Sequence, residues 1–230
     1  MHTSNRGRKG KQLEKTVFCF SSPSQILMTS AMIQILELGQ AVLLTIRSFD
    51  ISLSVLLLLL FSPLFLILAL LIKMTSKGPV LYWSQRVGKN NKLFRMPKFR
   101  TMQMGTPQVA THLLSDPSIY LTPVGALLRR TSLDELPQLF SILVGDLTFV
   151  GPRPALFNQD DLVSLRTERG IHMLVPGLTG WAQINGRDEL PIPEKVQFDY
   201  EYLQRRSFKF DLYIIIKTAF KIVSGDGIQH

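Results

Sequence analysis

The longest apolar run in the chain covers residues 51–72 and contains no charged side chain. A helix rises ~1.5 Å per residue, so a run of this length can cross a hydrocarbon layer of ~30 Å. Ser62 and Pro63 stand near its middle. Proline removes a backbone hydrogen bond and clashes with the preceding turn. The pattern therefore predicts a membrane helix with a bend at Ser62-Pro63.

Charges on both sides of this run bear on its topology. Arg47 precedes the run and Lys73 follows it. The positive-inside rule places both flanks on the cytoplasmic side of the membrane. A bent helix that dips into the membrane and returns satisfies this rule. An ordinary kinked span, or a pair of spans formed with residues 24–46, are the alternatives.

Residues 24–46 are apolar but carry a narrow polar stripe of Gln34, Glu37 and Gln40 at helical spacing. This pattern favours an amphipathic helix at the membrane interface. A first membrane pass and a helix packed on the main domain are the alternatives. Residues 1–16 are polar and basic, which predicts a disordered arm that touches anionic lipid.

From residue 74 onward the composition is that of a folded, water-facing domain. Residues 79–83 predict a short strand and residues 85–91 a turn. In residues 93–102, basic and apolar side chains alternate. This stretch fits either an edge strand with a solvated basic face or a surface that contacts phosphate through Lys98 and Arg100.

Three later segments predict helices. Residues 123–130 predict a short helix that carries Arg129 towards two carboxylates. Residues 159–169 predict a helix with its charges on the solvated face. Residues 207–223 are apolar with a stripe of lysines, which fits a helix lying on the membrane or a packed terminal helix with a basic edge.

Composition narrows the classes of partner. The 230 residues include 26 Lys+Arg and 17 Asp+Glu, giving a formal net charge of +9, so an anionic partner is expected among lipid head groups, nucleotides and nucleic acid. One cysteine excludes an internal disulfide and fits a reducing compartment. Neither a CxxC pair nor a P-loop or GxGxxG motif occurs. Zinc, Walker-type and dinucleotide sites are therefore not supported.

The candidate chemistry lies at Asp134 and Glu135, with Arg129 upstream and Arg153 downstream. The carboxylates stand at a predicted helix start, where free N–H groups favour anions, and arginine suits phosphate oxygens. A carboxylate there can act as a nucleophile or hold a divalent ion. The alternative is a capping box in which Ser132 and Glu135 bind only the backbone. Pro137 favours a helix start after Ser132 instead.

Residues 175–187 are rich in glycine and polar residues around Trp181. Such a loop can hold a base and ribose through Gln183, Asn185, Arg187 and the indole face. The alternative is a structural turn with Trp181 packed in the core.

The order of these motifs resembles that of the bacterial sugar transferases, small membrane-bound phosphoglycosyl transferases that start capsule, O-antigen and glycoprotein glycan assembly. The resemblance covers about residues 47–223. It rests on the central Ser62-Pro63 and on four later motifs, which are KFRTM at 98–102, LDELPQL at 133–139, GDLTFVGPRP at 145–154 and PGLTGWAQINGR at 176–187.

The resemblance implies an activity. Such an enzyme transfers sugar-1-phosphate from a UDP-sugar to undecaprenyl phosphate, uses Mg²⁺ and releases UMP in a ping-pong reaction. Asp134 would be the nucleophile and would carry the phosphosugar, with Glu135 as its partner and both as candidate metal ligands. Arg129 would contact phosphate, and Lys98, Arg100, Arg153, Gln183, Asn185 and Arg187 are the other candidate substrate-binding residues.

The resemblance also implies a fold and a location. The fold is mostly α with minor β (α+β), in a monotopic protein with a re-entrant helix broken at Ser62-Pro63 and amphipathic interfacial helices. We expect an N-terminal extension at 1–46, the membrane helix at 47–73 and a cytosolic catalytic domain at 74–230. The protein would lie in the bacterial inner membrane, with its catalytic domain on the cytoplasmic face.

Membrane lipid is the third expected partner, and later glycosyltransferases of the same pathway are further candidates. Nucleic acid is not expected, because no DNA- or RNA-binding motif accompanies the basic residues. Two competing functions share the same anchor. A non-catalytic scaffold would not need Asp134 and Glu135 between arginines. A glycosyltransferase that moves the sugar without its phosphate normally shows a D-x-D motif, which does not occur here.

Overall fold

The computed structural model describes residues 23–107, 116–186 and 190–224. The basic arm predicted at 1–16 and the candidate Arg187 lie outside these residues. The chain divides into two compact units, Met1–Ala41 and Val42–His230. The second unit holds all the candidate residues that the structure describes.

A single helix, α1 (Pro23–Thr75), contains both the segment predicted at 24–46 and the apolar run at 51–72. The sequence predicted two elements, and the structure corrects this. Arg47 and Asp50, which lie between the two segments, are part of this helix, and their side chains bind groups of the domain. Pro63 lies inside α1, and the Ser62 hydroxyl donates to the Leu59 carbonyl at 2.8 Å. That carbonyl is the acceptor that Pro63 leaves unpaired.

Within α1, Gly39–Thr75 is long and apolar enough to cross a membrane, and only 11% of its most apolar window is buried. Exposed leucines include Leu56, Leu59, Leu60, Leu66 and Leu70. A contiguous apolar surface of this kind marks a partner or a membrane rather than water. The helix is therefore compatible with a membrane anchor.

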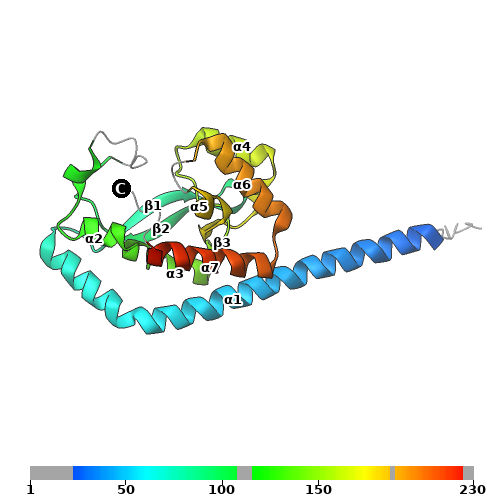
Figure 1. Cartoon of the computed structure of the whole chain (residues 1–230), viewed down its shortest axis with the longest axis horizontal. Helices are drawn as coiled ribbons and strands as arrows, with labels where there is room; N and C mark the ends of the chain where they lie inside the picture. Colours follow the sequence, from blue (N-terminus) through cyan, green and yellow to red (C-terminus); the bar gives the residue numbers. More distant parts are fainter. Residues whose placement is uncertain (1–22, 108–115, 187–189, 225–230) are drawn as a thin grey trace, which may run out of the picture. The chain divides into compact units, whose positions relative to one another are not determined.

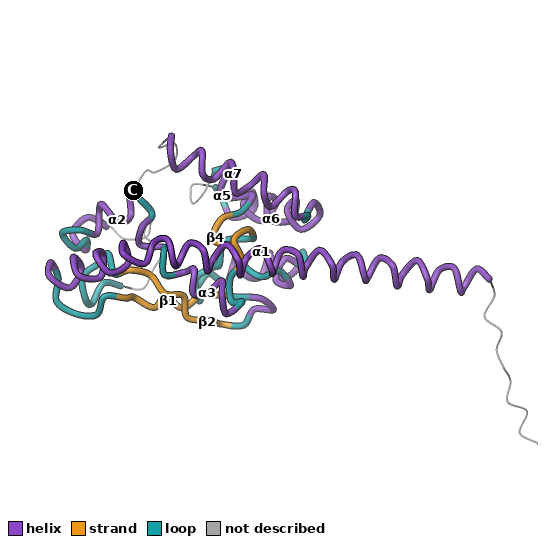
Figure 2. Tube along the Cα trace, turned by 90° about the horizontal axis from the view of Figure 1, so that it is seen from below, coloured by secondary structure: helices purple, strands orange, loops and turns teal. Residues whose placement is uncertain are grey.

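The predicted basic strand forms one arm of a hairpin. β1 (Leu81–Val87) pairs antiparallel with β2 (Leu93–Phe99), from Leu81↔Phe99 to Val87↔Leu93. A 3₁₀ turn, η1 (Lys89–Asn91), joins them. Figure 2 shows the hairpin on one side of α1 and the terminal helix α7 (Phe208–Ser224) on the other.

A second, smaller sheet brings two of the sequence motifs together. β3 (Thr148–Val150) lies parallel to β4 (Gly177–Thr179), with Thr148 opposite Gly177. A Cβ at Gly177 would lie 2.1 Å from the Gly151 nitrogen, so only glycine permits this approach. The motif at 145–154 therefore runs beside the motif at 176–187.

Short helices make up the rest of the domain (Figure 1). α2 (Gly125–Arg130), α4 (Asp160–Glu168) and α7 match the helices predicted at 123–130, 159–169 and 207–223. The others are η3 (Pro117–Tyr120), η4 (Leu133–Glu135), α3 (Gln138–Val144), η5 (Ile171–Met173), α5 (Trp181–Asn185) and α6 (Ile192–Arg205). The predicted class of mostly α with minor β is confirmed.

Two apolar clusters hold α1 against the domain. The larger one includes Ile142, Phe149, Tyr202 and Ile214, and Phe49 and Leu53 of α1 pack on it. The smaller one joins Leu68 and Ile72 of α1 to Phe99 of β2 and Leu128 of α2. Burial at these two places holds the Val42–Thr75 part of α1 against the elements that carry the candidate site.

Candidate active site

Asp134 and Glu135 lie in the 3₁₀ turn η4, just before α3 begins at Gln138. The predicted helix start, at Leu133 or Asp134, is therefore four or five residues too early. Ser132, the residue before η4, has φ of 55° and makes no capping hydrogen bond with its side chain. Because the Glu135 carboxylate binds side chains instead of the Ser132 backbone, the capping-box alternative is wrong.

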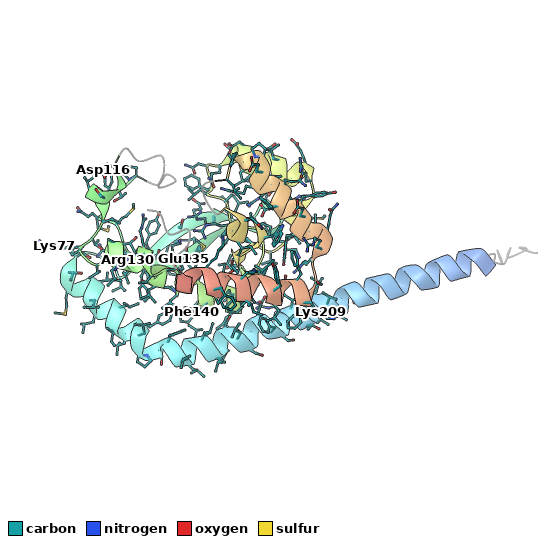
Figure 3. The ribbon with its side chains drawn as sticks, in the orientation of Figure 1. Lys77, Asp116, Arg130, Glu135, Phe140 and Lys209 are labelled. Atoms are coloured by element: carbon teal, nitrogen blue, oxygen red, sulfur yellow. The ribbon has the colours of Figure 1, made fainter. Side chains whose placement is uncertain are left out.

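Two cations from separate elements meet on Glu135. Lys98 Nζ of β2 donates to Oε1 of Glu135 at 2.7 Å, and Arg153 Nη2 donates to the same oxygen at 3.2 Å. Burial raises the pKa of Glu135, but Lys98 and Arg153 more than offset it and hold the pKa far below its ordinary value. The Glu135 carboxylate therefore stays ionised at neutral pH. Figure 3 labels this residue.

Asp134 has a different environment. Asp134 is 8% exposed, and its carboxylate has no hydrogen bond or ion pair within the described part of the chain. Burial raises the pKa of Asp134 against the opposing charge of Lys98, and the charge of Glu135 raises it further. The Glu135 carboxylate is thus ionised and bound by two cations, whereas the Asp134 carboxylate is free and more basic. Asp134 is therefore the better nucleophile.

Arg129 lies in the last turn of α2, and its Nε donates to the Thr101 hydroxyl at 3.0 Å. Burial lowers the pKa of Arg129, and the charge of Asp134 opposes this. The guanidinium therefore lies within electrostatic reach of Asp134. Thr101 was not singled out from the sequence, although it belongs to the motif at 98–102.

Arg166, which lies in α4, binds the backbone of Arg153 and so orients it. Its Nη1 donates to the Arg153 carbonyl at 2.8 Å, and its Nη2 lies 2.6 Å from Asp199 Oδ2 of α6. The prediction that the charges of this helix lie on its solvated face is wrong for Arg166, which is 8% exposed. Its carboxylate partner comes from a distant element, which no local pattern reveals.

Arg100 lies apart from this group. Its Nη2 donates to the carbonyl and hydroxyl of Ser76 at 3.1 and 2.8 Å, and its Nη1 donates to the Lys77 carbonyl. These contacts cap the end of α1. The two basic side chains of the motif at 98–102 thus serve different purposes, and the contacts of Arg100 do not support substrate binding.

The residues around Trp181 are packed. The indole nitrogen donates to Glu201 at 3.0 Å, and its ring contacts Phe210 at a centroid distance of 5.2 Å. This favours the structural alternative over a free indole face. Gln183 is 9% exposed, and both of its side-chain polar atoms are buried without a partner among the described residues. Asn185 is exposed and donates to the Trp181 carbonyl at 2.8 Å.

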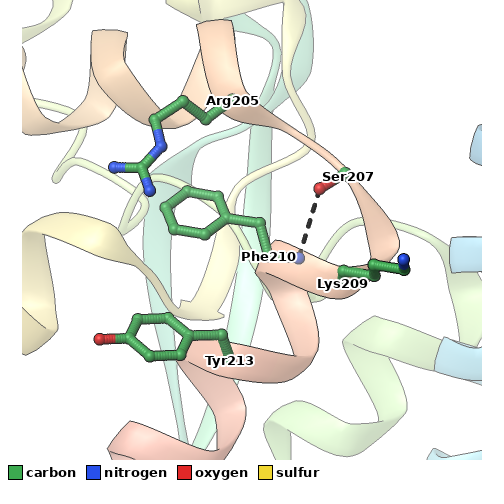
Figure 4. A pocket seen from close by; sticks show the side chains of 5 residues that line it. All are labelled: Arg205, Ser207, Lys209, Phe210 and Tyr213. Atoms are coloured by element: carbon green, nitrogen blue, oxygen red, sulfur yellow. Dashed lines mark hydrogen bonds between the residues drawn. The ribbon is translucent and has the colours of Figure 1, made fainter.

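A shallow cavity of about 390 Å³ lies where α6 meets α7 (Figure 4). Arg205, Ser207, Lys209, Phe210 and Tyr213 line it. The Arg205 guanidinium lies 4.4 Å from the Phe210 ring centroid, a cation–π contact. None of the side chains around Glu135 lines this cavity, so it is separate from the carboxylate pair.

A metal ion at this site would have the carboxylate pair as its protein ligands. The described residues contain no group of three or more His, Cys, Asp or Glu side chains that could hold an ion. Mg²⁺ in proteins often takes one or two carboxylates and completes its shell with substrate phosphates and water. The unengaged oxygens of Asp134 beside Glu135 fit that limited donor set.

Known proteins that match this chain point to the same family as the order of its motifs. The family described as "Bacterial sugar transferase" matches residues 41–225. The UDP-glucose:undecaprenyl-phosphate glucose-1-phosphate transferase of Escherichia coli (strain K12) is 42% identical over 184 residues, which cover 76% of this chain and 39% of that protein. The UDP-N-acetylgalactosamine-undecaprenyl-phosphate N-acetylgalactosaminephosphotransferase of Aeromonas hydrophila is 37% identical over 80% of this chain and 44% of its own length.

The match covers most of the length of a shorter relative. The exopolysaccharide production protein ExoY of Rhizobium meliloti (strain 1021) is 39% identical over 189 residues, which cover 75% of this chain and 82% of ExoY. The chain thus spans about two-fifths of the length of the E. coli and A. hydrophila relatives and most of the length of ExoY. By these matches, the chain belongs to the bacterial sugar transferase family.

Proposed function

We propose that this protein transfers a sugar 1-phosphate from a UDP-sugar to undecaprenyl phosphate and releases UMP, as the first step of a surface glycan or glycoprotein glycan. The observation that carries the proposal is the free Asp134 carboxylate beside the ionised, cation-bound Glu135. The names of the E. coli and A. hydrophila relatives give the same donor class and acceptor.

In the first half-reaction, an Asp134 oxygen attacks the phosphorus atom that bears the sugar. A new bond forms between that oxygen and phosphorus, and the bond to the oxygen shared with the nucleoside phosphate breaks. The electron pair leaves on that oxygen as part of UMP, so no proton has to be transferred. The product on the enzyme is an acyl phosphate in which Asp134 carries the phosphosugar.

In the second half-reaction, a phosphate oxygen of undecaprenyl phosphate attacks the same phosphorus. The bond from phosphorus to the Asp134 oxygen breaks, and the free carboxylate is restored. The product is undecaprenyl diphosphate sugar. Both half-reactions occur at one phosphorus centre and need one enzyme carboxylate, which is the nucleophile in the first and the leaving group in the second, and this fits a single free carboxylate among the described residues of this site.

The side chains around the pair supply charge and position. Arg129 and Arg153 can neutralise phosphate oxygens as negative charge moves towards the leaving group. Glu135 holds Lys98 and Arg153 at fixed positions. Mg²⁺, held by Asp134 and Glu135 together with donor phosphates, would offset further negative charge. Gln183 is a candidate contact for the donor nucleotide, because its buried amide has no partner in the part of the chain that the structure describes.

The acceptor is a lipid, so the site must stand at a membrane surface. Two apolar surfaces support this, the exposed leucines of α1 and the exposed side chains of Leu212, Ile216 and Phe220 on α7. We propose that α1 enters the cytoplasmic leaflet, bends at Ser62-Pro63 and returns. Labelling of single cysteines placed before residue 47 and after residue 73 should find both on the same side. Opposite sides would refute the re-entrant topology.

Product analysis with a panel of UDP-sugars and undecaprenyl phosphate tests the activity. We expect UMP from the wild type and none from Asp134→Asn, because the amide cannot act as the nucleophile. Incubation with donor alone should leave a phosphosugar on Asp134 that mass spectrometry detects. Asp146→Asn is the matched control, because Asp146 is exposed and lies outside the site. UDP as the product, or substantial turnover by Asp134→Asn, would overturn the proposal.

A further inference from the structure

The chain between Glu135 and Arg153 forms a loop whose two ends meet. α3 leads away from Glu135, the chain turns at Gly145, and β3 returns to Arg153. The ends are joined by the ion pair between Arg153 Nη2 and Glu135 Oε1 at 3.2 Å. The position of this ion pair therefore depends on where the closed end of the loop is held.

Arg47 of α1 binds that closed end. Its two Nη atoms donate to the carbonyls of Ile142 and Leu143, the latter at 2.6 Å. These carbonyls belong to the last turn of α3, where the helix dipole favours a cation. Gly145, with φ of 96°, ends the helix there, and its backbone passes close to the Arg47 guanidinium.

Asp50 binds the same end one helical turn later. Its Oδ2 accepts a hydrogen bond from the Thr148 hydroxyl at 2.6 Å, and its Oδ1 accepts one from the Phe149 N–H at 3.2 Å. Asp50 is 3% exposed. A buried carboxylate is costly unless it is bonded in this way, so the contact is specific in register.

We propose that Arg47 and Asp50 are positioning residues that couple the membrane helix to the catalytic ion pair. The inference rests on the proposed function. Arg47 and Asp50 are three residues apart and so lie on one face of α1. A slip of α1 by one residue would move that face by about 1.5 Å and turn it by about 100°, breaking all four hydrogen bonds. The depth of α1 in the membrane and the geometry at Glu135 are thereby linked.

Apolar packing alone would not fix this register. Phe49 and Leu53 of α1 also pack on the larger apolar cluster. Such contacts tolerate small shifts, because hydrophobic burial is not directional. The four polar contacts are directional, and they let the site meet a lipid phosphate at one fixed height above the membrane.

Double-mutant cycles test the coupling. In UMP-release assays, we expect Asp50→Ala to lower kcat/KM about tenfold or more, since it removes two hydrogen bonds to a charged group. Asp50→Asn retains an acceptor oxygen and should restore part of the loss. Thr148→Val removes one of the same bonds from the other side without altering α1. In an Arg153→Ala background, Asp50→Ala should cost less than about threefold, because the residue it positions is absent.

The Michaelis constant separates positioning from general destabilisation. Loss of Asp50 should raise KM for the UDP-sugar, as Arg153→Ala does, because a displaced Arg153 no longer binds the donor phosphate in its proper position. A general loss of folded enzyme lowers the apparent kcat and leaves KM unchanged. Asp146→Asn, a neutralised carboxylate in the same turn, is the control and should match the wild type.

Three results would overturn the inference. They are wild-type kcat/KM in Asp50→Ala, full multiplication of the losses in the Arg153→Ala background, and an unchanged KM for the donor in Asp50→Ala. Where Asp50→Ala yields no folded protein, Thr148→Val decides by the same cycle. A wild type that releases no UMP from any donor would instead refute the proposed function, so the two failures are distinct.

Discussion

Lys98 Nζ lies 2.7 Å from Glu135 Oε1, and this pair joins β2 to the turn η4 across 37 positions of sequence. Their side chains are only 14% and 20% exposed, so solvent screens the pair less than it screens a surface ion pair. Lys98 lowers the pKa of Glu135, and it also opposes the burial that raises the pKa of Asp134. One lysine thus favours the ionised form of both carboxylates.

Replacing Lys98 should therefore change the pH dependence of the reaction. In Lys98→Gln, the pKa of Asp134 should rise further because the charge that opposes its burial is gone, and the acidic limb of kcat/KM should move to higher pH. UMP release measured from pH 5 to 9 checks this. Lys92→Gln, at an exposed lysine in the hairpin turn, is the control. An unmoved limb in Lys98→Gln would show that Lys98 does not set these titrations.

The fold was predictable where one segment carries its own signal. The apolar run of α1, the β1–β2 hairpin and helices α2, α4 and α7 all follow from local patterns. Within residues 128–154, the sequence also placed Arg153 as a cation close to the carboxylate pair, and its Nη2 lies 3.2 Å from Glu135 Oε1. Both kinds of signal are contained in short stretches of sequence.

Other features depend on partners that are remote in sequence. Arg166 and Asp199 lie 33 positions apart, and nothing near either residue marks it as buried. Arg100 resembles Lys98 in sequence context, yet it caps α1 because the end of that helix passes beside it. Trp181 is packed because α6 supplies Glu201 and α7 supplies Phe210.

The Arg166–Asp199 pair gives a prediction about stability. The side chains are 9% and 1% exposed, and breaking a buried pair by removing one partner typically costs ~3–5 kcal/mol. Asp199→Asn should therefore lower the free energy of unfolding strongly. The double change Arg166→Met with Asp199→Leu should cost less, because no charge is left buried. Thermal unfolding in detergent micelles measures both, and equal losses would contradict this account.

Activity should not follow stability in that double variant. Arg166 also donates to the Arg153 carbonyl at 2.8 Å, and methionine cannot replace this bond. We expect kcat/KM to remain below the wild-type value even at temperatures where the double variant is fully folded. Full activity there would show that the bond to Arg153 is dispensable.

Ser132 adopts φ of 55° two residues before Asp134. Glycine takes this conformation without strain, whereas a β-branched side chain is strongly disfavoured there. Ser132→Gly should keep the free energy of unfolding within about 1 kcal/mol of the wild type, and Ser132→Val should lose ~1–2 kcal/mol. Melting temperatures measured on this pair check the difference. A Ser132→Val variant as stable as Ser132→Gly would show that the backbone can relax.

Asp211 of α7 gives a prediction about pH and stability. Burial raises the pKa of Asp211 to about 6 from its ordinary 3.8, against the lowering effects of Tyr202 and Arg206, while Asp50 raises it further. The Tyr202 hydroxyl lies 2.8 Å from Asp211 Oδ1 and 3.0 Å from the Val150 carbonyl, but it has one proton to donate. A protonated Asp211 can donate to the Tyr202 oxygen and leave the phenol proton for Val150.

The sign of the effect follows from the raised pKa. The protonated carboxyl favours the folded state fully below pH 3.8, and this contribution is lost as the pH rises through about 6. The interval between the two pKa values corresponds to an upper limit of ~3 kcal/mol. Asp211→Asn stays neutral and can still donate to Tyr202, so its stability should lack this loss. Melting temperatures of both proteins from pH 4 to 8 should diverge in favour of Asp211→Asn as the pH rises. A constant difference would place the pKa of Asp211 outside this range.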